Sequence, residues 1–334
     1  MCDFFPKQMP RELVFLITIF ILCAGTFHIF SHRMVDKHHR KHRNEERRVT
    51  SDSSDTFELN ITAPNDNPPN YNHCHWINNT HASWLLPSRP RMCIRGRDDI
   101  LSNVIHDIGR WPDCDDLIHV LLKPYNPNQG IFVDVGANIG ACSFLVAGNL
   151  FVTHAFEPQP DNLKYFRSTL GYHHSDFRDL IHLHTVALGD QSGESVIYRQ
   201  QGNAGNSVVG VVHPDDPNNK NDYILMQRNA ELIRISTLDD ELWPDNRTVA
   251  PKILVMKLDV QGFEVKVLQG AKRLLAARAV LAIKTEMAPA FLRAQGTSPL
   301  ALCHLLAGAG FAFQMHASVD QCAAADGELV AILV

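Results

Sequence analysis

The sequence lacks an excess of charge of either sign. Its 31 lysines and arginines stand against 36 aspartates and glutamates, so the 334 residues carry a formal net charge of −5. A protein whose main partner is a nucleic acid carries a basic face over a whole domain. The charge balance therefore argues against a nucleic-acid partner. Basic residues are concentrated only between Arg33 and Arg48.

The chain also lacks internal repeats, and hydrophobic residues make up 45% of it. A chain of this length and apolar content can bury one large core or two modest ones, which excludes a mostly disordered protein. Residues 49–72 differ, because they are rich in Ser, Asp, Asn and Pro, the composition of a flexible stem. The His-rich stretch 32–42 has no Cys or carboxylate framing, so no metal site is expected.

One long apolar run lies near the N-terminus. Residues 13–30, LVFLITIFILCAGTFHIF, contain no formal charge, and eighteen such residues suit a transmembrane helix. The core of a signal peptide is typically about 7–15 residues long, but the small Ala24 and Gly25 leave a cleaved signal peptide as the alternative. We expect an uncleaved signal anchor between a short tail (1–12) and a basic juxtamembrane segment with the stem (31–72).

Features of the sequence disagree on which side of the membrane the part of the chain after the anchor lies. The basic segment after the anchor favours a cytosolic C-terminal part under the positive-inside rule. Three N-x-S/T sequons, at Asn60, Asn78 and Asn246, favour glycosylation and therefore a lumenal C-terminal part. We expect a lumenal catalytic domain of a single-pass membrane protein in the Golgi or the endoplasmic reticulum.

Six cysteines follow the anchor, an even number that permits disulfides. Cys74, Cys93 and Cys114 lie in a loop-rich region where a disulfide would be useful. Cys142 begins a predicted core helix, so we expect it to be a free buried thiol.

From residue 131 onwards, strand and helix patterns alternate after a helical lead-in (73–130). Alternation of this kind predicts a parallel sheet with helices on both faces. The expected strands are 131–135, 151–156, 181–188, 253–260 and 279–287, and the expected helices are 100–108, 141–150, 160–171, 263–277 and 298–310. We therefore expect one α/β domain over 131–334.

Two pairs of strands interrupt or end this alternation. SVIYRQ (195–200) and ELIRIS (231–236) are expected to pair antiparallel as a β-hairpin insertion around a polar loop. FAFQMH (311–316) and ELVAILV (328–334) are expected to form a terminal antiparallel pair.

The first strand leads into the glycine turn DVGANIG. Asp134 ends the strand, and Gly136, Asn138 and Gly140 lead into the helix, whose N-terminal amides face an anion. A phosphate-binding loop would need a Lys that is missing here, and Asn138 replaces the second glycine of a dinucleotide fingerprint. The turn therefore favours a cofactor with a small anion, such as the carboxylate of S-adenosylmethionine, and makes a dehydrogenase a distant alternative.

The second strand ends at Glu157, about 20 residues beyond the turn, where an acidic residue is placed to bind ribose hydroxyls. Nicotinamide and S-adenosylmethionine cofactors both need that contact. Glu157 therefore supports a nucleoside cofactor in general.

Five motifs, DVGANIG, FEPQPDNL, VALGDQSGE, STLDDEL and KLDVQGFEVKVLQGAKRLL, together resemble the FkbM-type methyltransferase family in their order and spacing. The resemblance extends from about Asp98 to the C-terminus. It implies a class I (Rossmann-like, seven-stranded) methyltransferase fold, S-adenosylmethionine as methyl donor, and O-methylation of a sugar or other hydroxyl. One position departs from the commoner family motif D-x-E-G-x-E, because Gln261 replaces the first Glu.

Three carboxylates are candidates for the chemistry. Asp259 and Glu286 each end a strand of the predicted sheet, and ligands of open α/β sheets bind outside these strand ends, so both should edge the same crevice. A positioned base accelerates proton removal from a hydroxyl by typically 10²–10⁴-fold. We expect Asp259 to act as base or to position the acceptor, with Glu286 in support. Glu264 opens the next helix and either orients the acceptor or stabilises that helix end.

These features predict a membrane-anchored S-adenosylmethionine-dependent O-methyltransferase. Its acceptor would be a hydroxyl of a glycan, a glycolipid or a small metabolite. The alternative is a catalytically inactive binding module with the methyltransferase fold in the same membrane.

Overall fold

The computed structural model describes residues 72–78, 91–97, 99–199, 205, 207–210 and 230–334. All of them belong to one structural unit, Asp66–Val334. The predicted signal anchor and stem lie outside the described residues, as does most of the polar loop after residue 200. Across the described parts of the chain, no helix is both long enough and apolar enough to cross a membrane.

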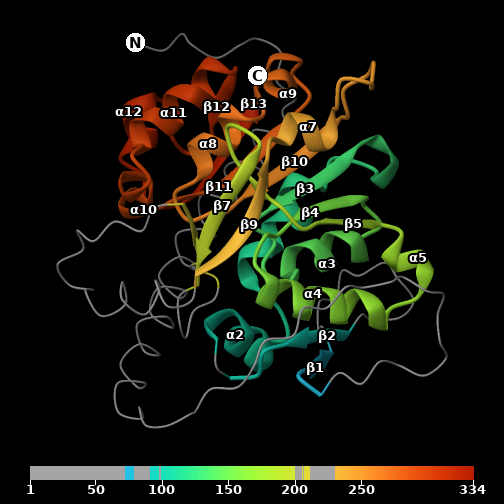
Figure 1. Ribbon diagram of the computed structural model, residues 1–334. Coiled ribbons are helices and arrows are strands. Elements are labelled where there is room, and N and C mark those ends of the chain that lie inside the picture. The colour runs from blue at the N-terminus through green and yellow to red at the C-terminus, as the bar shows by residue number, and fades with distance from the viewer. Residues whose placement is uncertain (1–71, 79–90, 98, 200–204, 206, 211–229) are drawn as a thin grey trace. The chain divides into compact units, whose positions relative to one another are not determined.

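A seven-stranded mixed sheet occupies the centre of this unit, with the spatial order β12-β13-β11-β10-β3-β4-β5 (Figure 1). Its strands are β3 (Ile131–Val135), β4 (Thr153–Phe156), β5 (Ile181–His184), β10 (Ile253–Leu258), β11 (Ala282–Met287), β12 (Phe311–Phe313) and β13 (Gly327–Leu333). Five neighbouring strands, from β5 to β11, are parallel, while β13 pairs antiparallel with both β11 and β12. The predicted parallel sheet and the predicted terminal antiparallel pair are therefore confirmed.

The central strands are apolar because both of their faces are covered. Every residue of β10, ILVMKL, is buried, as expected for a parallel strand between two helical layers. Helices α8 (Glu264–Gln269), α9 (Lys272–Ala276) and α11 (Pro299–Gly308) pack on one face. Helices α3 (Ala141–Gly148) and α4 (Pro160–Tyr172) pack on the other.

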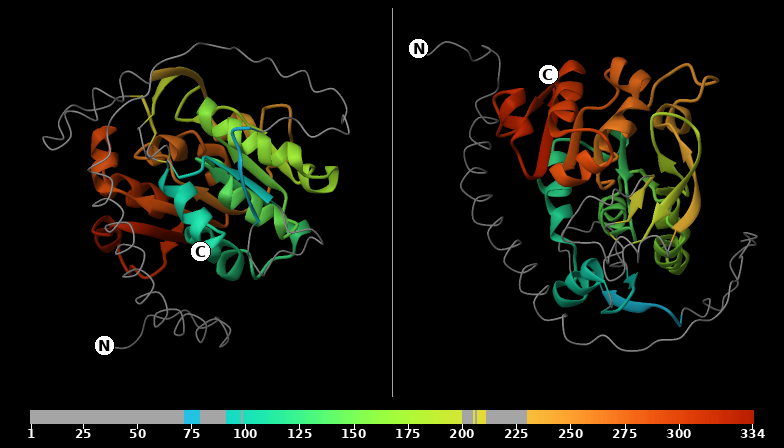
Figure 2. Two further views of the ribbon diagram at one scale, coloured as in Figure 1. Left: turned by 90° about the horizontal axis from the view of Figure 1, so that it is seen from below. Right: turned by 60° about the vertical axis from the view of Figure 1, so that its left-hand side comes forward.

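The lead-in covers the same face of the sheet as α3 and α4, and Figure 2 shows this arrangement from two further sides. It contains the predicted helix α2 (Ile100–Ile108), which ends at Gly109 with a left-handed backbone. It also contains two short strands that the sequence did not indicate. Its other elements are β1 (His75–Asn78), β2 (Arg91–Ile94), η2 (Pro112–Cys114), η3 (Leu117–Leu121) and η4 (Pro127–Gln129).

Two predicted elements are divided in the structure. The run 181–188 splits into β5 and β6 (Ala187–Leu188), which belong to different sheets. The helix expected over 263–277 breaks into α8 and α9 at Gly270, where a Cβ would lie 1.9 Å from the Gly189 carbonyl oxygen. This close backbone approach is possible only without a side chain.

The predicted hairpin insertion belongs to a second, four-stranded sheet with the order β6-β9-β7-β8. Its antiparallel pair, β7 (Gly193–Tyr198) and β9 (Ala230–Ser236), confirms the expected pairing. The sequence did not predict that β6 and β8 (Val208–Val209) would extend this pair into a sheet. The remaining short helices are α5 (Ser175–Arg178), α7 (Leu238–Leu242), α10 (Pro289–Ala294) and α12 (Val319–Ala323).

Three disulfides join the six cysteines that follow the predicted anchor. The pairs are Cys74–Cys93, Cys114–Cys142 and Cys303–Cys322. The expectation of a free thiol at Cys142 is wrong, because η2 packs against the first turn of α3 and brings the Cα atoms of this pair to 5.2 Å. This disulfide fastens the lead-in to the helix that follows the glycine turn.

Candidate functional site

The glycine turn lies at the carboxyl end of β3, beside the end of β10. Gly136 has a φ of 80°, and a Cβ at this position would lie 1.9 Å from the Asp259 carbonyl oxygen. The amides of Gly136 and Ala137 both donate to the Phe156 carbonyl oxygen at 3.0 Å. The turn is thus pressed against two neighbouring strands, and only a glycine fits at its start.

Glu157 fastens this turn to the end of β4. Its side chain is only 4% exposed, and Oε2 accepts a hydrogen bond from the Asn138 amide at 2.7 Å. Oε1 accepts from the Gln159 amide at 2.8 Å and from Asn162 Nδ2 at 3.1 Å. Burial raises the pKa of Glu157, while these three hydrogen bonds favour the charged form. The predicted cofactor residues Asn138 and Glu157 are therefore brought together.

The side chain of Asn138, in the glycine turn, has a hydrogen-bond acceptor without a partner among the described residues. Its backbone is left-handed, with a φ of 54°, and its Oδ1 is buried without a hydrogen-bond partner among the described residues. An unpaired buried acceptor costs about 1–3 kcal/mol. A ligand that donates a hydrogen bond here would remove that cost.

Asp134 is fully buried and is bound by the protein itself. Its Oδ2 accepts from Ser143 Oγ at 2.6 Å, and its Oδ1 lies 3.3 Å from Lys257 Nζ. Gly140, at the start of α3, has a φ of 94° and packs against Phe144. These two residues of the predicted cofactor site therefore shape the turn from inside.

Lys257 links the turn to the candidate catalytic residues. Its Nζ lies 3.5 Å from Asp259 Oδ2 and donates to the Gly136 carbonyl oxygen at 3.3 Å. Burial alone would lower the pKa of Lys257, but the carboxylates of Asp134 and Asp259 raise it above its usual value. Lys257 was not among the predicted site residues, although a lysine inside the apolar strand ILVMKL is a signal that could have identified it.

Gln261 joins the two predicted catalytic carboxylates. Its Nε2 donates to Asp259 Oδ1 and to Glu286 Oε2, both at 2.9 Å. Its backbone is left-handed with a φ of 52°, and its Oε1 is buried without a partner among the described residues. The neutral amide that departs from the commoner family motif thus binds two carboxylates at once.

Glu264 faces inward and is only 1% exposed. Its Oε1 accepts from the amides of Val260 at 3.2 Å and Gly262 at 3.1 Å, so it holds the loop between β10 and α8. Glu264 was predicted either to orient the acceptor or to stabilise the start of the helix, and these two hydrogen bonds are of the kind that stabilises a helix start. Burial raises the pKa of Glu264 to about 7, and the nearby charge of Asp259 acts in the same direction. Three backbone hydrogen bonds to the carboxylate oppose this rise in pKa.

Glu286 lies at the end of β11 beside this loop. Burial raises its pKa to about 7, and the charges of Asp259 and Glu264 act in the same direction. A carboxyl group with such a pKa can exchange a proton near neutral pH. The structure therefore assembles Asp259, Glu264 and Glu286 next to the glycine turn.

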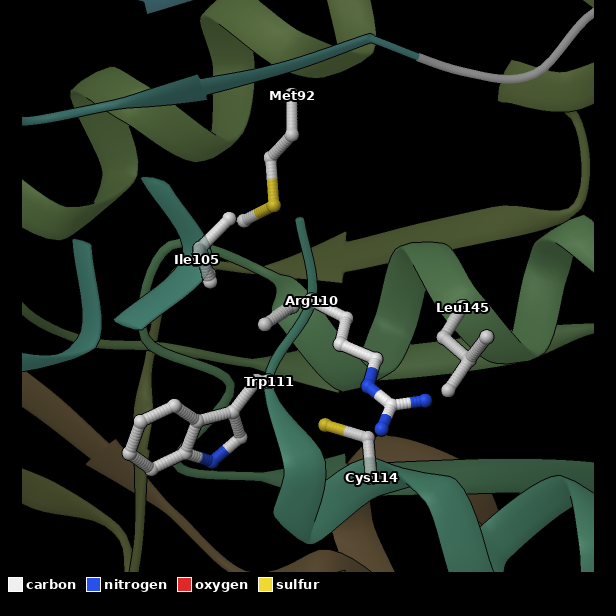
Figure 3. Close-up of a pocket in the computed structure, with 7 residues that line it drawn as sticks. Met92, Ile105, Arg110, Trp111, Cys114 and Leu145 are labelled. Carbon is white, nitrogen blue, oxygen red and sulfur yellow. The ribbon is translucent and has the colours of Figure 1, made fainter. Parts of the chain in front are cut away.

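A separate small pocket lies between the lead-in and α3 and contains none of these residues. Figure 3 shows side chains of the lead-in, such as Arg110, Trp111 and Cys114, together with Leu145 of α3. Its lining is mostly apolar, and it encloses no space for a bound molecule. It is a packing defect around the Cys114–Cys142 disulfide.

The fold and the site together define an α/β protein with a large mixed sheet and a cluster of polar residues at its strand ends. Residues 134–313 match the model of the methyltransferase FkbM domain, which is more than half of the chain. The protein belongs to the FkbM methyltransferase family. None of the curated protein sequences is a significant match.

Three solved structures are distantly similar. Methyltransferase FkbM from Methylobacillus flagellatus KT is 20% identical, with 62% of this chain and 44% of that chain covered and a TM-score of 0.38. Monomeric WbdD is 13% identical, with 69% and 43% covered and a TM-score of 0.36. Precorrin-6y C5,15-methyltransferase from Geobacter metallireducens GS-15 is 12% identical, with 64% and 85% covered and a TM-score of 0.31.

This chain spans less than half the length of the first two structures.

Replacing Glu264 by Gln is expected to stabilise the protein more at alkaline than at acidic pH. The folded-state pKa of about 7 exceeds the ordinary 4.5, so the stabilising contribution is complete below pH 4.5 and is lost as pH rises through 7. Glu264→Gln keeps an oxygen for the two amides and removes the titrating charge. The free energy of unfolding should rise by roughly 3 kcal/mol near pH 8, at 1.36 kcal/mol per unit of pKa shift.

Denaturant unfolding at several pH values measures this difference, with the exposed Glu194→Gln as control. A gain that is equal at pH 5 and pH 8 would show that Glu264 does not titrate in this range.

Proposed function

We propose that the protein is an S-adenosylmethionine-dependent O-methyltransferase with a class I fold. The observation that carries the proposal is a glycine turn with an unpaired buried Asn138 Oδ1, held by Glu157 and placed directly beside the carboxylate pair Asp259 and Glu286. The proposed binding site for the methyl donor thus lies next to the carboxylates that would take the proton from the acceptor hydroxyl. The five parallel strands and the antiparallel final strands support the class I assignment.

The residues at the turn fit S-adenosylmethionine. Asn138 Oδ1 needs a hydrogen-bond donor, and the turn before α3 presents backbone amides to a small anion. Glu157 Oε2 receives one hydrogen bond and retains capacity for a ribose hydroxyl. We propose that Gly136, Asn138 and Glu157 contact the donor directly, while Asp134 and Gly140 shape the turn.

S-adenosylmethionine, when bound, supplies an electrophilic methyl group. Asp259 and Glu286 then receive the proton that an acceptor hydroxyl must lose, and Gln261 holds both carboxylates in place. Lys257 orients Asp259 through their 3.5 Å contact. Glu264 fixes the loop that carries Gln261.

We further propose a single-pass membrane protein with this domain in the lumen of the Golgi or the endoplasmic reticulum, acting on a glycan, a glycolipid or a hydroxylated metabolite. The three disulfides support a lumenal location, since disulfides persist in oxidising compartments. The sequon at Asn246 lies in an exposed turn, where a glycan could be attached.

Glu157→Ala is expected to weaken S-adenosylmethionine binding by roughly tenfold to a hundredfold, because a hydrogen bond to a charged group is worth about 1.5–3 kcal/mol. The variant also frees the Asn138 amide, which acts in the same direction. Calorimetric titration measures the dissociation constant, with the exposed Glu194→Ala as control and melting temperature as the test of folding. Unchanged affinity in a folded Glu157→Ala protein would remove Glu157 from the donor site.

Asp259→Asn is expected to lower turnover by at least about a hundredfold while donor affinity stays near that of the natural protein. Glu286→Gln should also lower turnover, and in the natural protein kcat should rise with pH up to about 7, where Glu286 loses its proton. A methyl-transfer assay with labelled donor over a screen of glycans and lipids measures both. Full turnover in Asp259→Asn would refute its role, and equal loss of donor binding would make it a donor ligand. Donor binding without transfer to any acceptor would favour the inactive binding module.

The full-length protein expressed in eukaryotic cells is expected to lose mass on glycosidase treatment, and Asn246→Gln should reduce that shift. Sealed microsomes should protect the domain from added protease. A protein with no glycosidase-sensitive mass that is also digested outside sealed microsomes would face the cytosol.

A further inference from the structure

A row of carboxylates crosses three neighbouring strands on the side of the sheet that the lead-in covers. Glu286 and Glu328 are register partners on β11 and β13. Asp259 directly follows Leu258, the partner of Thr285, so it continues the row on β10. Residues in register on neighbouring strands point to the same face. We name Asp259, Glu286 and Glu328 the acid row.

Two buried lysines lie one step behind this row. Lys257 and Lys284 are register partners on β10 and β11, two residues before Asp259 and Glu286. Lys284 Nζ lies 2.8 Å from Glu328 Oε1 and 2.6 Å from Asp116 Oδ1. Both lysines are thus already paired with two carboxylates each, and neither is left to bind an anionic ligand.

The lead-in adds carboxylates beside the acid row, next to Lys284. Lys284 Nζ also donates to the Asp113 carbonyl oxygen, and Cys114 is bonded to Cys142 of α3. The short turn around Asp113 is therefore clamped on both sides. Its carboxyl group reaches solvent, and no hydrogen bond or ion pair of that group is found among the described residues.

Asp113 interacts electrostatically with the acid row. Asp113 is exposed at the surface, but loss of water on its protein-facing side raises its pKa. The charge of Lys284 opposes this rise, and the charge of Asp259 adds to it. The carboxyl groups also crowd Glu328, at the β13 end of the acid row. Burial raises the pKa of Glu328 to about 7, and the charges of Asp116 and Asp113 act in the same direction, while the charge of Lys284 opposes them. The region therefore holds more acid than its lysines neutralise.

Buried oxygens without partners lie at the same place. Glu264 Oε2 and Gln261 Oε1 are both buried and unpaired among the described residues. Glu264 is close enough to Asp259 and Glu286 for their charges to act on one another. Acceptor atoms without donors, beside excess negative charge, call for a ligand that brings hydrogen-bond donors and positive charge.

A metal ion is a poorer match than an organic cation. Within the described residues, the group of three or more potential ligand atoms that converges within 4.8 Å is His73, Cys74 and Cys93, and the two cysteines of that group form a disulfide. The acid row does not converge in that way. The Gln261 amide, moreover, already stands between Asp259 and Glu286.

We propose that the acceptor carries an ammonium group beside the hydroxyl that is methylated, and that Asp113 of the lead-in binds this group next to the acid row. The proposal rests on the proposed methyl transfer and names the class of its substrate. It makes Asp113 a specificity residue outside the segment that matches the family model, residues 134–313. Anionic acceptors are disfavoured, since they would meet uncompensated carboxylates.

Three probes that differ only at the exocyclic C6 carbon test this inference: methyl glucoside, methyl 6-amino-6-deoxyglucoside and methyl glucuronide. They present a hydroxyl, an ammonium and a carboxylate on the same sugar. Binding to the full-length protein is measured by saturation-transfer NMR, and donor binding is measured separately by calorimetry. We expect the amino sugar to bind roughly tenfold to a hundredfold more tightly than the glucoside, and the glucuronide to bind least.

Asp113→Asn should remove most of the preference for the amino sugar and leave donor affinity unchanged. Asp115→Asn is the matched control, because it removes the same charge two residues away, in an ion pair with Arg110. Equal binding of the three probes, no binding of any of them, tightest binding of the glucuronide, or an unchanged preference in Asp113→Asn would each overturn the proposal. So would saturable binding of Mg²⁺ or Mn²⁺ that is lost in Asp113→Asn. Loss of donor binding alone would instead count against the methyltransferase function, because the sugar titration needs no donor.

Discussion

Lys257 Nζ lies 3.3 Å from Asp134 and 3.5 Å from Asp259, and it also donates to the Gly136 carbonyl oxygen. An ammonium group removed from water costs several kcal/mol unless partners surround it. Asp134, Asp259 and the turn must therefore all be in place together. This constraint couples the proposed donor side of the site, at the end of β3, to the proposed acceptor side, at the end of β10.

The layered α/β fold was predictable because the apolar runs are short, regularly spaced and buried on both faces. Strand ends were predictable for the same reason, and they placed Glu157, Asp259 and Glu286 at one edge of the sheet. That Asn138 and Glu157 meet also followed from neighbouring strand ends. In the structure, the Asn138 amide donates a hydrogen bond of 2.7 Å to the Glu157 carboxylate.

Other features depend on contacts between distant segments, which no local pattern records. The break at Gly270 exists because the Gly189 backbone passes within reach of it, and the Cys114–Cys142 disulfide exists because η2 docks on α3. The inward orientation of Glu264 depends on two amides of its own loop. A charged residue at a helix start looks the same in sequence whether it faces solvent or the interior.

Gln261 shows how one substitution changes the electrostatics of such a site. A glutamate at this position would place a further carboxylate between Asp259 and Glu286, and the group would then need a proton or a cation to remain together. The amide instead donates to both neighbours and adds no further negative charge between them. The remaining excess of acid lies farther out, at Glu328 and at Asp113 of the lead-in, where a ligand rather than the protein can balance it. A lead-in outside the matched segment thus determines the charge that the family's site presents.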